Sequence, residues 1–326
     1  MTKPFFEDFQ YKGVDNDTQI KRMVEARETA LVETGFSSDT HGQKLATYMT
    51  TPETLLSDDI IVRTTAFSDD NGRESGAVFD ALIAANTGRR VITANAPGID
   101  YYSDLRGDHL QEMTPDQREA LRTSGSYGKI GAAVFKAIDG MRAQLDLNGG
   151  YIFTGSSMGV AIMGGMIAAS KESRVVGITI AEAVNVSDRS TLSLGAQFAA
   201  QSLSAPGYGA MNPAVLRELD EPPLQWINRM KFNTKPNYRY ARAMAHGAFL
   251  ADIGTPEHLE TIPVYISRGA GSRLSPPDAP VKIAKHLKEI DAAVQTRVFG
   301  NADTNPHDHP YTLTVQSVID SVNAVI

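Results

Sequence analysis

The sequence predicts an α/β fold: a mainly parallel sheet that is flanked by helices and interrupted by a helical insertion. Apolar, β-branched segments alternate with segments of helical spacing, which is typical of βαβ units. The strand candidates are almost continuously apolar, as expected for parallel strands that are covered on both faces. With 326 residues, the chain is long enough for one large domain of this kind with an insertion.

The alternating elements follow one another in a regular order after residue 57. Strands are expected at 59–67, 89–98, 150–154, 174–184, 261–267 and 295–300, and helices at 74–86, 127–145, 158–170, 279–293 and 311–326. Residues 1–57 are polar and mixed, with helical spacing over 19–34 and an early strand candidate over 43–51. We expect residues 1–57 to form an N-terminal extension together with the first strands.

The alternation stops at residue 185 and resumes near residue 259. Between these points the chain is helical in pattern, rich in proline and irregular, and it contains the single tryptophan, Trp226. We therefore expect residues 1–184 and 259–326 to form the core domain and residues 185–258 to form an inserted cap or lid. The methionines and aromatic residues of the cap either line an apolar pocket or form a small core of its own.

Composition excludes several classes of function. The chain has no cysteine, which rules out disulfides, thiolate catalysis and cysteine-ligated metals. A net charge of -7 without a basic cluster argues against nucleic acid as a partner. The glycine patterns of nucleotide-binding loops are missing, so we expect no cofactor. Neither a long apolar run nor a signal-like N-terminus is present, which predicts a soluble, cytoplasmic protein without a membrane span.

One short motif carries most of the functional information. Gly155-Ser156-Ser157-Met158-Gly159 lies between an apolar strand candidate and a helix candidate rich in small residues. A serine hydroxyl becomes a useful nucleophile only when it is aimed at its target and exposed to a base. A sharp strand-to-helix turn aims it, and flanking glycines let the strand and the helix approach each other. The motif therefore predicts Ser157 as a nucleophile.

This motif, in its strand–turn–helix context, resembles the nucleophile elbow of the α/β-hydrolase family, and the resemblance covers roughly residues 59–326. The segment "VITANAPGIDYYSD" is similar to the strand and Pro-Gly turn of that family, and the insertion lies where the family carries its cap. The resemblance implies a serine hydrolase, most often a carboxylic ester hydrolase. Its expected substrate is a small, uncharged and partly apolar ester or related acyl compound; the oligomeric state is not predicted.

The resemblance also implies an oxyanion hole made of two backbone amides. One belongs to the residue after the nucleophile, Met158. The other lies in the loop after the 59–67 strand, where the family often has His-Gly and an apolar residue. Here the loop reads Thr65-Ala66-Phe67, so Phe67 is the candidate for the second donor.

The expected acid departs from the usual pattern of the family. After the strand at 261–267, Ser272 stands where the family usually has aspartate. Glu182, at the end of the 174–184 strand, should emerge at the same sheet edge as Ser157, and we prefer it as the acid. Asp188 and Asp278 remain weaker alternatives.

The expected base lies in the loop before the last helix. His307 and His309 are both in this loop, and we prefer His307 because His309 directly precedes Pro310. A gapless match to the spacing of the family would instead place Asp303 at this position. The two histidines with Asp308 between them could also chelate a metal, but a third ligand is not visible nearby, so no metal site is predicted.

These departures at the acid, the base and the oxyanion loop motivate a second hypothesis. In this alternative, the chain is a catalytically degenerate α/β-hydrolase-fold protein with a binding or structural role. The two hypotheses differ in one physical requirement, because only a hydrolase needs a histidine within hydrogen-bond reach of Ser157.

Overall fold

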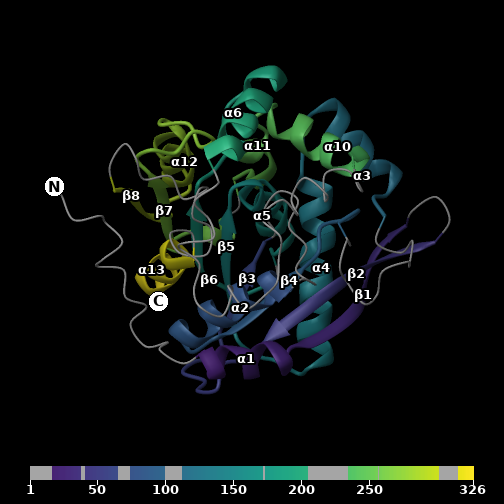
Figure 1. Ribbon diagram of the computed structural model, residues 1–326, viewed down its shortest axis with the longest axis vertical. Coiled ribbons are helices and arrows are strands. Elements are labelled where there is room, and N and C mark those ends of the chain that lie inside the picture. The colour runs from purple at the N-terminus through teal and green to yellow at the C-terminus, as the bar shows by residue number, and fades with distance from the viewer. Residues whose placement is uncertain are drawn as a thin grey trace.

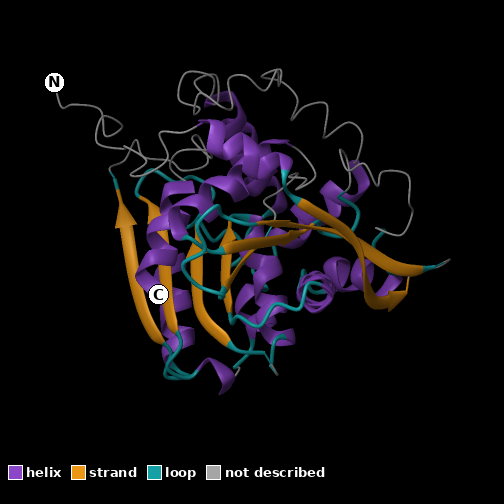
Figure 2. Ribbon diagram, turned by 90° about the horizontal axis from the view of Figure 1, so that it is seen from below, coloured by secondary structure: helices purple, strands orange, loops and turns teal. Residues whose placement is uncertain are grey.

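The computed structural model describes residues 17–37, 41–64, 74–99, 112–171, 173–204, 234–255, 257–300 and 315–326. Within these residues, eight strands form one sheet, and helices cover both of its faces (Figures 1 and 2). The strands are β1 (Glu28–Ser37), β2 (Gly42–Thr50), β3 (Ile60–Arg63), β4 (Arg90–Ala94), β5 (Tyr151–Ser156), β6 (Val175–Ala181), β7 (Pro263–Gly269) and β8 (Ala293–Phe299).

The sheet is mainly parallel and has the strand order β1-β2-β4-β3-β5-β6-β7-β8. Strand β2 is antiparallel to both of its neighbours, and the strands from β4 to β8 run parallel to one another. The sheet twists strongly from one edge to the other, as Figure 2 shows. Because β3, β5, β6 and β7 are neighbours with the same direction, the loops that follow them meet at one edge of the sheet.

Two hydrophobic clusters separate the helices into two layers. Helices α4 (Gly128–Gln144), α5 (Met158–Ala169) and α12 (Ala279–Lys288) pack on one face. Helices α1 (Asp17–Glu25), α2 (Glu74–Thr87) and α13 (Val315–Val325) pack on the other. The central strands are buried from both sides, which explains why they read as continuous apolar runs in the sequence.

Helices α4 and α5 approach each other closely enough for their backbones to touch. A Cβ atom added at Gly131 of α4 would lie 2.3 Å from the carbonyl oxygen of Ile162, and one added at Gly165 of α5 would lie 2.6 Å from that of Gly128. These glycines are therefore required by packing. Their close contact fixes the position of α5, and with it the turn from β5 into α5.

Among the described residues between β6 and β7, the regular elements are all helical. They are α6 (Thr191–Ser204), α10 (Thr234–Met244), α11 (Phe249–Ile253) and a 3-10 turn at Glu257–Leu259. Helices α6, α10 and α11 lie together at the top of Figure 1, where α3 (Pro115–Thr123) is next to α10. Residues 185–258 are called the insert below.

The insert is attached to the core by hydrogen bonds at its C-terminal end. The carboxylate of Asp252 accepts a hydrogen bond from the hydroxyl of Ser126 and another, at 2.7 Å, from the backbone N–H of Tyr127. The hydroxyl of Tyr240 donates to the carbonyl of Pro97 at 2.8 Å, and the Tyr127 hydroxyl donates to the carbonyl of Tyr240 at 2.6 Å. The two tyrosine rings stack with their centroids 5.8 Å apart.

The strand and helix candidates after residue 57 are confirmed wherever the structure describes them, with ends that differ by a few residues. The helical interpretation of 19–34 is wrong beyond Glu25, because residues 28–37 form β1. Burial along β1 alternates, with Val32 and Thr34 buried and Glu33 exposed, which is the period of a strand. Helix α3 was not predicted, although its capping box of Thr114 and Gln117 is visible in the sequence.

Candidate active site

The Gly155–Gly159 motif forms a sharp turn between β5 and α5. Ser157 is its turning residue, with φ 55° and ψ -125°, a backbone conformation that residues other than glycine rarely adopt. A Cβ atom at Gly155 would lie 3.1 Å from both the Cα and the N atom of Val160, which is closer than most real contacts. Glycine at this position therefore lets the first turn of α5 lie directly against the end of β5.

Met158 is the first residue of α5 and is fully buried. An α-helix leaves its first N–H groups without carbonyl partners, and the positive end of the helix dipole lies at the same place. The N–H of Met158 thus belongs to the set of donors that can stabilise an anion formed next to Ser157. Met158 remains the predicted donor for one half of an oxyanion hole.

Glu182 lies beside Ser157 at the end of the neighbouring strand. Ser156 of β5 pairs with Ala181 of β6, and the N–H of Ser157 donates to the carbonyl of Ala181 at 3.1 Å. The N–H of Glu182 in turn donates to the carbonyl of Ser267 in β7, also at 3.1 Å. Glu182 also has a positive φ, 55°, so the chain turns away from the sheet at both residues.

The carboxylate of Glu182 is buried, with 2% of the residue exposed, and it is held by the loop that follows β7. Its Oε1 atom accepts a hydrogen bond from the N–H of Gly269 at 2.5 Å. Burial raises the pKa of Glu182 to about 7, although this hydrogen bond, the nearby hydroxyl of Ser272 and the positive charge of Arg268 act in the opposite direction.

The two weaker candidates for the acid have different surroundings. Asp188 is exposed. The side chain of Asp278 is 54% exposed, and it forms an ion pair with Lys282 at 2.7 Å within α12. The hydrogen bond from Lys282 lowers the pKa of Asp278. Neither aspartate is buried or held by the loops at the sheet edge, as Glu182 is.

Several predicted site residues lie outside the described residues. They are Phe67, the candidate for the second oxyanion donor, the two candidate bases His307 and His309, and Asp303, the residue that a gapless alignment would favour. Two histidines that the structure does describe have contacts elsewhere. His258 lies 3.4 Å from the hydroxyl of Ser170, and the Nε2 atom of His286 lies 2.6 Å from the carbonyl oxygen of Gly254.

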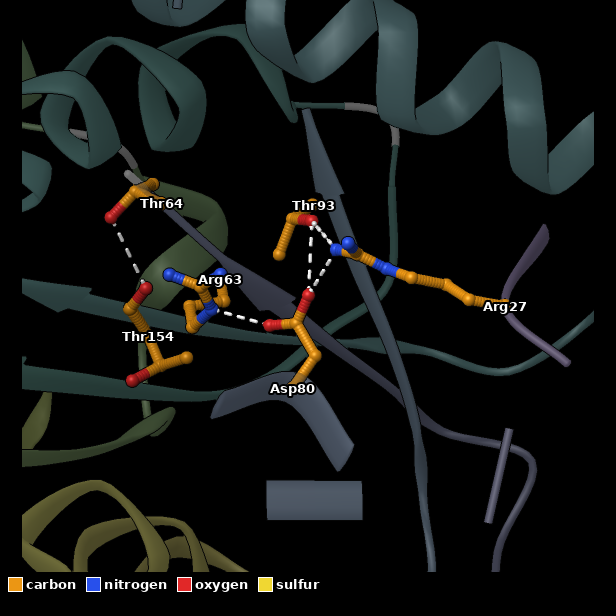
Figure 3. Close-up of polar contacts among 6 residues, drawn as sticks. All are labelled: Arg27, Arg63, Thr64, Asp80, Thr93 and Thr154. Carbon is orange, nitrogen blue, oxygen red and sulfur yellow. Dashed lines mark hydrogen bonds and ion pairs between the residues drawn. The ribbon is translucent and has the colours of Figure 1, made fainter. Parts of the chain in front are cut away.

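A buried ionic cluster, which sequence reasoning did not identify, lies at the carboxyl end of β3 (Figure 3). The carboxylate of Asp80, on α2, forms ion pairs at 2.5 Å with both Arg27 and Arg63, and Thr93 donates a hydrogen bond to it at 3.3 Å. Arg63 is the last residue of β3, from which the chain leads toward residues 65–67. The only sequence signal was the position of Asp80 inside an otherwise apolar helical run.

Two further observations concern the described residues only. No group of three or more histidine, aspartate or glutamate side chains in them is arranged to hold a metal ion. Among the helices that the structure describes, none combines the length and the apolar character needed to cross a bilayer.

Comparison with solved structures identifies the fold of the chain. No protein-family model and no curated protein sequence matches the chain. Among solved structures, the chain is similar to a thermostable carboxyl esterase from Bacillus coagulans, with 13% identity and a TM-score of 0.54 over 92% of this chain and 99% of the esterase. It is also similar to an esterase from Pyrococcus furiosus, with 10% identity and a TM-score of 0.54 over 92% of this chain and 89% of that one.

A third similar structure is a meta-cleavage product hydrolase from Pseudomonas fluorescens, with 13% identity and a TM-score of 0.51 over 91% of this chain and 97% of the hydrolase. The chain therefore has the α/β-hydrolase fold, and the fold that the sequence predicted is confirmed. At these identities the similarity establishes the fold, and the activity has to be argued from the site.

Proposed function

We propose that the protein is a serine hydrolase that cleaves carboxylic esters, with Ser157 as its nucleophile. The observation that carries this proposal is the turn at Ser157, which is strained, opens a helix and lies at the strand end next to Glu182, whose carboxyl group is buried. Backbone strain of this kind is retained where surrounding packing enforces it, and it is concentrated at functional positions. The esterases among the similar structures support the same class of reaction.

In the proposed reaction, the hydroxyl oxygen of Ser157 attacks the acyl carbonyl, and His307 accepts the proton of the hydroxyl. The tetrahedral oxyanion accepts hydrogen bonds from the N–H groups of Met158 and Phe67. His307 then donates the proton to the departing alcohol, which leaves an acyl-enzyme. Water, deprotonated by His307, attacks the acyl-enzyme and releases the carboxylic acid and free Ser157. Glu182 accepts the Nδ1–H of His307 and stabilises the imidazolium that forms in each half of the reaction.

Two features support Glu182 as the acid. It occupies the strand end next to Ser157, and its carboxyl group is buried and held by a donor from the loop after β7. Asp188 and Asp278 lack this burial. The choice of His307 over His309 rests on the sequence alone.

We further propose that the insert, residues 185–258, is the cap over this site. It begins three residues after Glu182, and Arg189 within it donates to the carbonyls of Val184 and Leu274 at 2.5 and 2.8 Å. These contacts join the start of the insert to the loop after β7. The strand ends that carry the proposed acid are therefore directly connected to the insert.

The experiment that tests the function is labelling with a fluorophosphonate probe followed by peptide mapping, together with hydrolysis of p-nitrophenyl esters of increasing acyl length. We expect one adduct, on Ser157, that is lost in Ser157→Ala. Ser156→Ala is the matched control, because it removes the neighbouring hydroxyl and should still be labelled. Histidine variants at 307 and 309 then identify the base, with His307→Ala as the variant expected to lose turnover.

The competing hypothesis, a catalytically degenerate protein of the same fold with a binding or structural role, rests on three departures from the family pattern: Thr65-Ala66 in place of His-Gly, Ser272 in place of the acid, and the altered spacing of the histidine base. Absence of both an adduct and ester turnover in the folded protein would favour it. An adduct that persists in Ser157→Ala would contradict the assignment of the nucleophile.

A further inference from the structure

The side chain of Arg268 is buried near the proposed acid, and it does not form an ion pair with it. Only 6% of the residue is exposed. Its guanidinium donates to the carbonyls of Gly269, Ser272 and Ser275 at 3.0, 2.8 and 3.0 Å, with a longer contact of 3.4 Å to that of Ala270. Every hydrogen bond that it makes to the described residues thus goes to the backbone of the loop 269–275. This loop is folded around one buried cation.

The same loop presents a donor to the carboxyl group of Glu182. The N–H of Gly269 donates to Oε1 at 2.5 Å. The hydroxyl of Ser272 accepts a hydrogen bond from the N–H of Ser275 at 3.3 Å, and it lies close enough to Glu182 to favour the ionised form of the carboxyl group. The loop therefore holds the carboxylate by a donor whose position depends on how the loop is folded.

We propose that Arg268 is a positioning residue for Glu182: its guanidinium folds the loop 269–275 so that Gly269 holds the carboxylate and Ser272 lies close to it. The catalytic meaning of this inference rests on the proposed function, whereas the contacts themselves do not. Arginine suits this role because its planar fork binds several carbonyls at once in a fixed geometry, which lysine cannot do.

The charges around Glu182 agree with this role. From β7 and its loop, Arg268 supplies a positive charge, Gly269 supplies a hydrogen bond, and the hydroxyl of Ser272 lowers the pKa of Glu182 as well. On the opposite side of β6 from β7, the residue next to Glu182 is Ser157, which follows β5 and is uncharged. Among the described residues, Arg268 is the charge that acts on the Glu182 carboxyl group, and it favours the ionised form. Loss of Arg268 should remove both the charge and the loop geometry, so the pKa of Glu182 should rise.

The test follows the pKa of Glu182 directly. The protein is labelled with glutamate that carries ¹³C in the side-chain carboxyl group, and the carboxyl signals are titrated by NMR. The Glu182 signal is the one missing from Glu182→Gln. Wild type is compared with Arg268→Met, Arg268→Lys and Ser272→Ala. Arg142→Met is the matched control, because Arg142 donates to the carbonyl of Leu147 at the amino end of β5, far along the chain from the loop.

We expect the pKa of Glu182 to rise by about one unit in Arg268→Met and in Ser272→Ala, by less in Arg268→Lys, and not at all in Arg142→Met. If turnover is present, the acid limb of the kcat/KM profile should move to higher pH in the same order. If Arg268 had only a structural role, its replacement would lower the stability of the protein without moving the acid limb of the kcat/KM profile.

The inference is overturned if the pKa of Glu182 stays within about 0.3 unit of the wild-type value in folded Arg268→Met. If Arg268→Met does not fold, Arg268→Lys and Ser272→Ala decide by the same criterion. Because the NMR titration needs no turnover, the two proposals can fail separately. If the pKa of Glu182 shifts in Arg268→Met but the wild-type protein has no esterase activity, the proposed function is contradicted and the positioning role stands. If the pKa does not shift and the wild-type protein is an active esterase, the positioning role is contradicted and the proposed function stands.

Discussion

Ser157 and Glu182 stand at matching positions on neighbouring strands, and both have a backbone φ of 55°. The residues before them, Ser156 and Ala181, are register partners in β5 and β6. The chain therefore leaves the sheet at two adjacent strand ends, those of β5 and β6. Because both turns occur at the same edge, a proposed nucleophile and a proposed acid that are 25 positions apart in the sequence become neighbours.

The conformation of Ser157 predicts an unusual effect on stability. Relief of a positive φ with a strained ψ should yield about 1–3 kcal/mol, whereas glycine costs about 0.5–1 kcal/mol in backbone entropy. Ser157→Gly should therefore have a free energy of unfolding about 1 kcal/mol above that of Ser157→Ala, which keeps the strain. Urea denaturation of the two inactive variants measures this difference. A Ser157→Gly variant that is less stable than Ser157→Ala by the entropy cost of glycine, about 0.5–1 kcal/mol, would show that the turn stores no strain.

Glu182→Gln should stabilise the fold in a pH-dependent way. Burial raises the pKa of Glu182 from 4.5 to about 7 in the folded protein. Between these values the folded state keeps a proton that the unfolded chain has released, so the free energy of unfolding of wild type falls as pH rises. The loss reaches about 3 kcal/mol above pH 7. Glu182→Gln, which does not titrate, should exceed wild type in stability at pH 8 and lose this advantage near pH 4, as measured by urea denaturation.

The same substitution should be harmful to turnover. If Glu182 orients the base, the amide removes the negative charge that stabilises the imidazolium, and kcat should fall about 10³–10⁴-fold with little change in KM. Matched variants at the other candidates, Asp188→Asn and Asp278→Asn, should keep near-normal kcat. The assignment of the acid is wrong if either of them abolishes turnover while Glu182→Gln does not.

A carboxylate placed at residue 272 should partly replace Glu182. The hydroxyl of Ser272 is close enough to Glu182 to lower its pKa, so an aspartate there would bring its negative charge close to the same place. The double variant Glu182→Gln with Ser272→Asp should recover about tenfold or more of the kcat that Glu182→Gln loses. Ser272→Asp alone should be less active than wild type, because two buried carboxylates would repel each other. Steady-state ester hydrolysis by all four proteins tests this, and a double variant no better than Glu182→Gln contradicts it.

Asp80→Asn should be among the most destabilising single substitutions outside the active site. Asp80, Arg27 and Arg63 have side chains that are between 1% and 7% exposed. Removal of one partner from a buried ion pair costs about 3–5 kcal/mol, because a buried charge is left without compensation. Glu119→Gln, which breaks the exposed pair with Arg122, is the control and should leave stability unchanged. Similar midpoints of thermal unfolding for the two variants would argue against an important role of the cluster.

Much of the fold could be predicted because the sheet is buried from both sides. Continuous apolar runs located β3, β5 and β6, and the motif around Ser157 located the turn into α5. Strand β1 was misread because its apolar residues also fit helical spacing, and only its pairing with β2 decides the outcome. The strand order depends on contacts between distant segments, which periodicity in a single sequence does not encode.

The site could be predicted residue by residue only where a motif or a strand end marks the position. Ser157 and Glu182 are marked in this way. Ser272 stands where the family usually has aspartate, but its effect on Glu182 depends on how the loop after β7 folds. Arg268 and Asp80 carry no motif, since a single arginine at a strand end and a single aspartate in an apolar helix have many ordinary explanations. Asp80 is buried with partners far away in the sequence, and Arg268 is buried with hydrogen bonds to the loop 269–275.

The attachment of the insert has a consequence for engineering. Helix α4 begins at Gly128 with Tyr127 as its N-terminal cap residue, and the side chain of Tyr127 forms no capping hydrogen bond. Asp252, from the insert, accepts the Tyr127 N–H instead, and Tyr240 covers the ring of Tyr127. Exchange of the insert for that of another protein would therefore remove the acceptor of the Tyr127 N–H at the start of a central helix and expose an aromatic ring. The insert should accordingly be altered by point substitutions, because it is not a transferable module.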